Sequence, residues 1–143
     1  MASPIIALVA PTLGGGIGRN IVNLANAFYS KGYGIHLVLD ELGDEYADQI
    51  KNGIGIVRMP TSHAYTGVPF LGAYLLRCKP DVVLTPNVRQ TVLALRTRSV
   101  LRASTRVFTN IHSTFSELFK TLSPNKCVRH VSPYDDGILA ATA

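Results

Sequence analysis

The fold is decided by residues 5–18, which are IIALVAPTLGGGIG. The first six of these form an unbroken apolar run closed by Pro11, a pattern typical of a strand buried on both faces of a parallel sheet. Four glycines follow within residues 14–18. Apolar residues then recur at helical spacing from Ile17 to Phe28, and Lys31-Gly32 supplies a basic last turn and a C-cap. The chain therefore begins with a strand, a glycine loop and a helix.

The rest of the chain repeats this alternation. Further strands are predicted at residues 35–39, 54–59, 82–85 and 106–109, and helices at 43–52 (short), 68–78 and about 93–103. Beyond these, we expect a helix around 115–122, a strand at 128–131 and a helix at 135–143. Alternating strands and helices imply right-handed crossovers. The sequence therefore predicts an α/β fold, a Rossmann-like parallel sheet with helices on both faces.

The bulk composition fits one such domain. The chain has 143 residues, of which 47% are hydrophobic and 16% charged, and its apolar runs are too short to span a bilayer. The N-terminus has no basic region that would precede a signal peptide. Cys78 and Cys127 lie far apart, without metal-ligand spacing, so neither a disulfide framework nor a zinc site is expected. These features predict a cytoplasmic protein.

Fourteen basic and nine acidic residues give a formal charge of +5, and much of the excess lies between Arg77 and Arg106. Such a charge favours anionic partners, either nucleotide phosphates or a phospholipid surface. Nucleic acid is disfavoured because the chain has no RNA-binding signature. A peripheral contact at the inner face of the membrane stays open, although residues 96–106 also suit a solvated helix face.

The glycine loop is the strongest chemical signal. A loop between a buried strand and a helix exposes backbone N–H groups and the positive helix end to an anion. A tight turn without a ligand is the simpler interpretation. A dinucleotide fold would explain Asp40 at the end of the second strand, but its third glycine would fall on Arg19 or Ile21. A phosphate-binding loop of the Walker type would need a Gly-Lys-Ser or Gly-Lys-Thr sequence, which is missing.

Several stretches, taken together, resemble the retaining family 4 glycosyltransferases. They are residues 10–19 (APTLGGGIGR), 23–28 (NLANAF), 31–38 (KGYGIHLV), 79–84 (KPDVVL), 110–114 (NIHST) and 131–136 (VSPYDD). The resemblance covers nearly the whole chain. Members of this family have the GT-B fold, in which two Rossmann-like domains face each other across a cleft. The resemblance implies that residues 1–143 are the N-terminal, acceptor-side half, ending before the C-terminal domain that binds the nucleotide sugar.

The resemblance also implies site residues. Gly15, Gly16 and Ile17 would approach the donor diphosphate and sugar, and His112 would be a catalytic residue beside the donor sugar. Residues at the carboxyl edge of the sheet and at the first helix are candidates for binding the acceptor: Arg19, Thr85, Asn87, Arg89 and Ser113. A loop histidine that makes local hydrogen bonds is the alternative for His112. Arg19 at the start of a helix is more often a solvated side chain, although it could meet an anionic acceptor. His36, His63 and His130 are expected to have no catalytic part.

The implied reaction is transfer of a sugar from a nucleoside diphosphate sugar to a glycan or lipid-linked acceptor, with retention of configuration. Stabilisation of the leaving diphosphate would come largely from the missing domain, so this fragment alone is expected to be inactive. No D-x-D motif occurs, and the resemblance requires neither a metal nor a cofactor. Two alternatives remain, a stand-alone nucleotide or phosphosugar binding module and an NAD-type Rossmann oxidoreductase.

Overall fold

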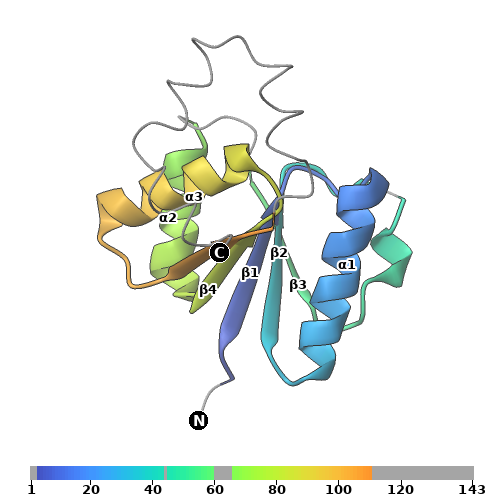
Figure 1. Ribbon diagram of the computed structural model, residues 1–143. Coiled ribbons are helices and arrows are strands. Elements are labelled where there is room, and N and C mark those ends of the chain that lie inside the picture. The colour runs from blue at the N-terminus through green and yellow to red at the C-terminus, as the bar shows by residue number, and fades with distance from the viewer. Residues whose placement is uncertain (1–2, 44, 60–65, 111–143) are drawn as a thin grey trace, which may run out of the picture.

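The computed structural model of the protein describes residues 3–43, 45–59 and 66–110. Within these residues five strands form one parallel sheet in the order β3-β2-β1-β4-β5. The strands are β1 (Ile5–Ala10), β2 (Gly34–Leu39), β3 (Gly55–Arg58), β4 (Val82–Thr85) and β5 (Arg106–Thr109). Figure 1 shows the sheet in the middle of the domain, with helices on either side.

The central position of β1 explains its unbroken apolar sequence. It pairs with β2 on one side, where Ile6 lies opposite Ile35, and with β4 on the other, where Ile6 lies opposite Val82. A strand with two neighbours and a helix on each face has no solvated side, so every residue can be apolar. The edge strands β3 and β5 instead alternate between exposed and partly buried residues.

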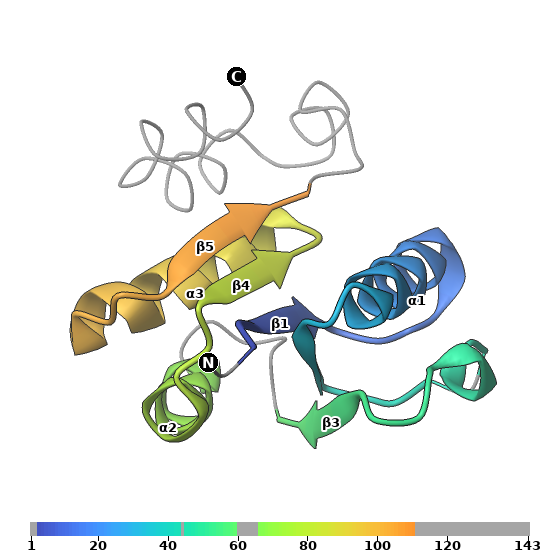
Figure 2. The same cartoon turned by 90° about the horizontal axis from the view of Figure 1, so that it is seen from below.

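Helices cover both faces of the sheet, as the sequence predicts (Figure 2). One face packs against α1 (Gly15–Ser30), and the other against α2 (Gly67–Cys78) and α3 (Val88–Leu101). The cluster on the α1 face includes Leu8, Leu37, Ile21, Val22 and Ala25. The cluster on the opposite face includes Val9, Val38, Val83, Leu71 and Leu93. The alternation of strand residues between the two clusters follows from the period of two in a strand.

The helix ends use left-handed backbone in three places. Gly32 follows α1 with φ +88°, and its N–H donates to the carbonyl of Tyr29 at 3.0 Å. The other two helices end on residues with side chains: Lys79 follows α2 with φ 43°, and Arg102 follows α3 with φ 49°. Non-glycine residues in this region cost about 1 kcal/mol each.

The strands and major helices occur where the sequence predicts them, and three details differ. The helix predicted at about 93–103 begins earlier, at Val88, and ends at Leu101. Of the described residues in 43–52, only Ala47–Gln49 are helical, in the single 3-10 turn η1, because this polar segment lacks the apolar periodicity that packs a full helix. β3 is also shorter than the predicted strand at 54–59. The elements predicted at 115–122, 128–131 and 135–143 lie outside the described residues. Among the described helices, none combines the length and hydropathy needed to cross a membrane.

Candidate functional site

The strand order creates a switch point between β1 and β4. The chain leaves β1 toward β2 on one side, and later returns to place β4 on the other side of β1. The loops that follow these two strands lead into α1 and α3, which lie on opposite faces of the sheet (Figure 1). Open α/β sheets bind ligands at this position, where loops diverge at the carboxyl ends of the strands. The glycine loop after β1 and the residues after β4 therefore flank one candidate site.

Two of the four glycines in the loop are required by the fold itself. Gly15 has φ +65°, a conformation that is costly for residues with a side chain. At Gly18 a Cβ atom would overlap the backbone carbonyl of Leu13. Only a glycine at this position therefore allows α1 to pack this closely against the backbone of the loop after β1. These two positions account for the turn and for the close approach of the helix.

Neither the turn nor the close approach of the helix requires a glycine at position 16. Its φ is not positive, and a Cβ atom at this position would meet nothing within 4 Å. The N–H groups of Gly16 and Ile17, at the start of α1, have no hydrogen-bond partner in the part of the chain that the structure describes. Ile17 is also 37% exposed. Open space beside unpaired backbone N–H groups at a helix N-terminus suits the approach of an anion.

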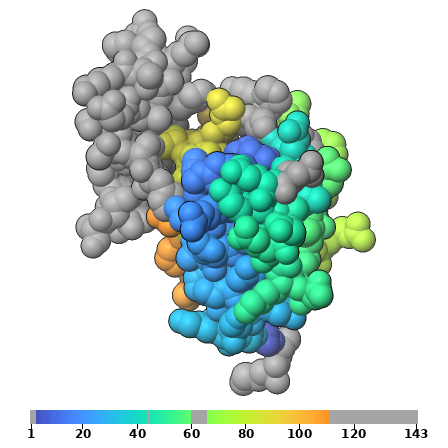
Figure 3. Space-filling view, turned by 90° about the vertical axis from the view of Figure 1, so that its right-hand side faces the viewer, coloured from blue at the N-terminus to red at the C-terminus, as the bar shows by residue number. Residues whose placement is uncertain are grey.

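A carboxylate already contacts the neighbouring N–H group. Gly15 N–H donates to Glu45 Oε2 at 2.8 Å. This hydrogen bond, together with one from Tyr46, lowers the pKa of Glu45 below its ordinary value. Glu45 lies between β2 and η1, and Figure 3 shows α1 and the η1 segment side by side on this surface. The helix start therefore attracts negative charge within the protein itself, as the positive helix end predicts.

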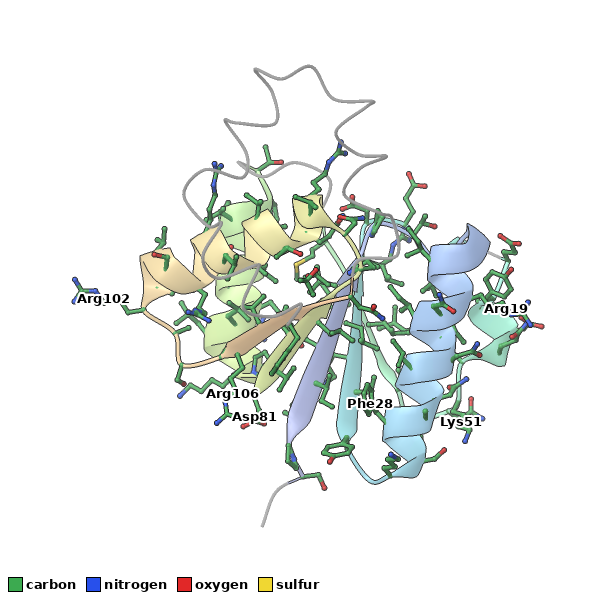
Figure 4. The ribbon with its side chains drawn as sticks, in the orientation of Figure 1. Arg19, Phe28, Lys51, Asp81, Arg102 and Arg106 are labelled. Atoms are coloured by element: carbon green, nitrogen blue, oxygen red, sulfur yellow. The ribbon has the colours of Figure 1, made fainter. Side chains whose placement is uncertain are left out.

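Sequence reasoning missed Glu45. The acidic segment after the second strand could have indicated this contact. The carboxyl ends of adjacent parallel strands lie at the same edge of the sheet, so the segment after β2 lies near the glycine loop after β1. Arg19 lies on the same side: its positive charge acts on Tyr46, whose pKa is raised chiefly by the hydrogen bond to Glu45. Figure 4 shows Arg19 on the side of α1 away from β4. The structure thus separates Arg19 from Thr85, Asn87 and Arg89.

The residues after β4 make internal contacts. Thr85 is 0% exposed, and its Oγ1 lies 2.7 Å from Thr91 Oγ1 and donates to the Phe108 carbonyl at 3.3 Å. Asn87 caps α3, because its Oδ1 accepts from the Gln90 N–H at 3.2 Å. These bonds orient the start of α3 toward the carboxyl edge of the sheet. Binding of an acceptor by Thr85 and Asn87 stays a prediction, and Arg89 is exposed beside them.

One further polar group near the start of α3 was not foreseen. Gln90 is 1% exposed, and its buried Oε1 has no hydrogen-bond partner among the described residues. Buried polar atoms are normally paired, so an orphan of this kind is unusual.

The remaining candidates divide between described and undescribed residues. His36 lies inside β2, as expected, and its Nδ1 is 2.8 Å from the Tyr74 hydroxyl, whose pKa is raised mainly by burial. His112 and Ser113 lie outside the described residues, as do His63 and His130. The described residues contain no group of three or more metal-ligating side chains.

Comparisons with known proteins support the α/β fold and do not identify a family. No family model matches the chain, and no curated protein matches it. One solved structure that matches is that of glycinamide-RNase-transformylase T from Mycobacterium tuberculosis, at 22% sequence identity and a TM-score of 0.50. The match covers 72% of this chain but only 28% of that chain. At this identity the similarity shows a shared α/β architecture alone.

Proposed function

We propose that this domain is the acceptor-side half of a GT-B glycosyltransferase that transfers a sugar from a nucleoside diphosphate sugar with retention. The observation that carries the proposal is Gly16. It lies at the start of α1, beside unpaired N–H groups and open space, and neither turn geometry nor packing requires a glycine there. The resemblance of residues 10–19 to family 4 glycosyltransferases supplies the ligand, a donor diphosphate.

The chemistry of the loop suits that ligand. A diphosphate carries negative charge that the positive end of α1 and the N–H groups of Gly16 and Ile17 would stabilise. Charge grows on the leaving diphosphate as the glycosidic bond breaks, so donors fixed beforehand lower the barrier. Glu45 would have to yield its place near Gly15 if the phosphates approached that N–H group. His112 would lie beside the donor sugar and Ser113 beside the acceptor.

The second domain would complete the site. In this proposal the second domain binds the nucleotide and supplies most of the charge stabilisation. Residues 1–143 alone would therefore not catalyse sugar transfer. The acceptor is a glycan or a lipid-linked sugar, placed near Arg89 and the end of β4. A lipid-linked acceptor would bring a cytoplasmic enzyme to the inner face of a membrane.

The test is sugar transfer by the full-length protein, with a panel of nucleoside diphosphate sugars. We expect Gly16→Trp to raise the donor KM and to lower kcat/KM at least tenfold, and His112→Ala to lower kcat. Ala27→Trp is the matched control, because Ala27 is an exposed residue of the same helix, remote from the loop. Rates that Gly16→Trp and His112→Ala leave unchanged would contradict the site. Equal losses in Gly16→Trp and Ala27→Trp would show damage to the helix instead.

One observation favours a second candidate, an NAD-type oxidoreductase. Asp40 follows β2 directly, and its N–H donates to the Pro11 carbonyl at 3.2 Å, so it lies beside the first loop. An acid in this place binds the adenosine ribose in dinucleotide folds. Calorimetry with NADH and with nucleoside diphosphate sugars separates the two candidates. A heat of binding with NADH alone would contradict the glycosyltransferase proposal, whereas a heat of binding with a nucleotide sugar alone would support it.

A further inference from the structure

The first turn of α3 contains a buried polar atom that the fold leaves unpaired. Gln90 is 1% exposed, and its Oε1 has no hydrogen-bond partner among the described residues. Its backbone N–H, in contrast, donates to Asn87 Oδ1 at 3.2 Å. An unpaired buried acceptor destabilises a protein, and an apolar side chain of similar shape avoids this cost. Packing alone therefore does not explain a glutamine at this position.

The neighbours of Gln90 along α3 show which way it faces. Leu93, Ala94 and Thr97 follow it at the spacing of one helix face. Leu93 and Ala94 pack in the same cluster as Val9, the residue before the last one of β1. Gln90 lies one turn closer to the start of α3, and α3 starts at the carboxyl edge of the sheet. It therefore lies on the β1 side of α3, at the edge where the glycine loop follows β1.

The side of α3 that faces β4 and β5 has its polar groups paired. Thr91 is the next residue after Gln90, and its Oγ1 lies 2.7 Å from both Thr85 Oγ1 and the Asn87 carbonyl oxygen. Long side chains on a helix point back toward its N-terminus. The amide of Gln90 is therefore directed toward the switch point between the glycine loop and α3, where the loops after β1 and β4 diverge (Figure 1).

We propose that Gln90 is a specificity-determining residue, whose Oε1 accepts a hydrogen bond from a hydroxyl group of a sugar bound at the switch point. The proposal rests on the proposed function, which brings a nucleotide sugar and a sugar acceptor to this edge. An amide oxygen only accepts hydrogen bonds, so an ionised phosphate oxygen is not its partner. The positive end of α3 and the exposed Arg89 disfavour a cationic donor. A sugar hydroxyl is an uncharged donor.

The absence of a partner makes Oε1 ready for such a ligand. Rotation of the Gln90 side chain toward a sugar breaks no hydrogen bond of this atom among the described residues. A hydrogen bond formed away from water is also stronger than one at the surface. A site built to bond a hydroxyl rejects an analogue without it, because the buried polar group is then left unpaired. Gln90 would thereby select sugars by the position of one hydroxyl.

The experiment compares the full-length protein with its Gln90→Met variant, in which a side chain of similar length lacks the acceptor. Calorimetry with UDP-glucose, UDP-N-acetylglucosamine, GDP-mannose, UDP and GDP measures Kd, and the transfer assay measures the acceptor KM. We expect Gln90→Met to weaken sugar binding by about threefold to tenfold, with the affinities for UDP and GDP unchanged. It should also raise Tm, because the unpaired buried acceptor is removed. Gln49→Met, at an exposed glutamine of η1, is the matched control and should change neither quantity.

The assay also identifies the sugar. A higher Kd for a nucleotide sugar assigns the hydroxyl to the donor, and a higher acceptor KM at unchanged Kd assigns it to the acceptor; either result supports the inference.

The results that would overturn the inference differ from those that would overturn the proposed function. Unchanged Kd and acceptor KM in Gln90→Met, with a lower Tm, would show that an internal group such as a buried water pairs with Oε1. Transfer that Gly16→Trp abolishes and Gln90→Met leaves unchanged would contradict the role of Gln90 alone. Absence of both nucleotide-sugar binding and transfer in the wild type would contradict the proposed function, and the role of Gln90 with it.

Discussion

The glycine loop allows a prediction that separates stability from ligand binding. Substitution by alanine should have opposite effects on stability at Gly18 and at Gly16. At Gly18 the new Cβ atom would overlap the Leu13 carbonyl, so the backbone of α1 or of the loop must move. At Gly16 the new Cβ atom meets nothing within 4 Å, and the residue lies in a helix, where alanine is favoured over glycine.

The magnitudes follow from these contacts. Overpacking costs about 1–3 kcal/mol, and a clash with backbone rather than with a flexible side chain places Gly18→Ala at the upper end or above it. Alanine in place of glycine stabilises a helix interior by about 1 kcal/mol and the first turn by less, so Gly16→Ala should gain between 0 and about 1 kcal/mol. Gly15→Ala should lose about 1–2 kcal/mol, because alanine strains at φ +65°.

Urea unfolding followed by circular dichroism measures all three variants. For a domain of this size, 1 kcal/mol shifts Tm by about 2–8 °C, so the losses at Gly18 and Gly15 should be visible in thermal scans as well. A loss at Gly16 comparable to that at Gly18 would refute the reasoning, because Gly16 would then have a structural role. Gly16→Ala should also weaken donor binding without lowering stability, a combination that a purely structural glycine cannot give.

Three other predictions concern single contacts. Lys79→Gly should stabilise the protein by about 0.5–1 kcal/mol in urea unfolding, because it relieves the left-handed backbone after α2. Thr85→Val should cost about 0.5–1.5 kcal/mol in the same assay, because it removes the buried hydrogen bonds of Thr85 Oγ1 with Thr91 Oγ1 and with the Phe108 carbonyl; a stabilising result would contradict this account. Glu45→Gln should lower stability at neutral pH. The lowered pKa of Glu45 means that its contribution is present above the unfolded-state pKa and is lost as pH falls through the folded-state pKa, so wild type and variant should converge in acid; a pH-independent difference would contradict this account.

The parts of the fold that sequence could predict are those with regular periodicity. The apolar run at 5–10 and the spacing from Ile17 to Phe28 determine β1 and α1, because burial on two faces or on one helix stripe leaves a periodic pattern. The contact between Glu45 and Gly15 has no such pattern, since it joins two loops that meet only after β1 and β2 pair. The roles of individual glycines were likewise hidden, because Gly16 and Gly18 differ only in their three-dimensional neighbours.

The candidate site shows the same limit. Its place at the carboxyl edge followed from the strand and loop order, whereas the buried network of Thr85 and Thr91 depends on how α3 lies over β4 and β5. Sequence position alone put Thr85 and Arg19 in one acceptor group. The structure places Thr85 in the interior and Arg19 on the side of α1 away from β4.

The position of β1 between β2 and β4 has a consequence for the order of folding. Ile6 meets Ile35 through a short crossover, but it meets Val82 only after the intervening chain has closed a much longer loop. Loop closure is entropically more costly for distant pairs, and contacts of high sequence separation slow folding. We expect the unit of β1, α1 and β2 to form first and β4 to dock later. Destabilising substitutions in β4 should then accelerate unfolding more than they slow refolding, in contrast to those in α1.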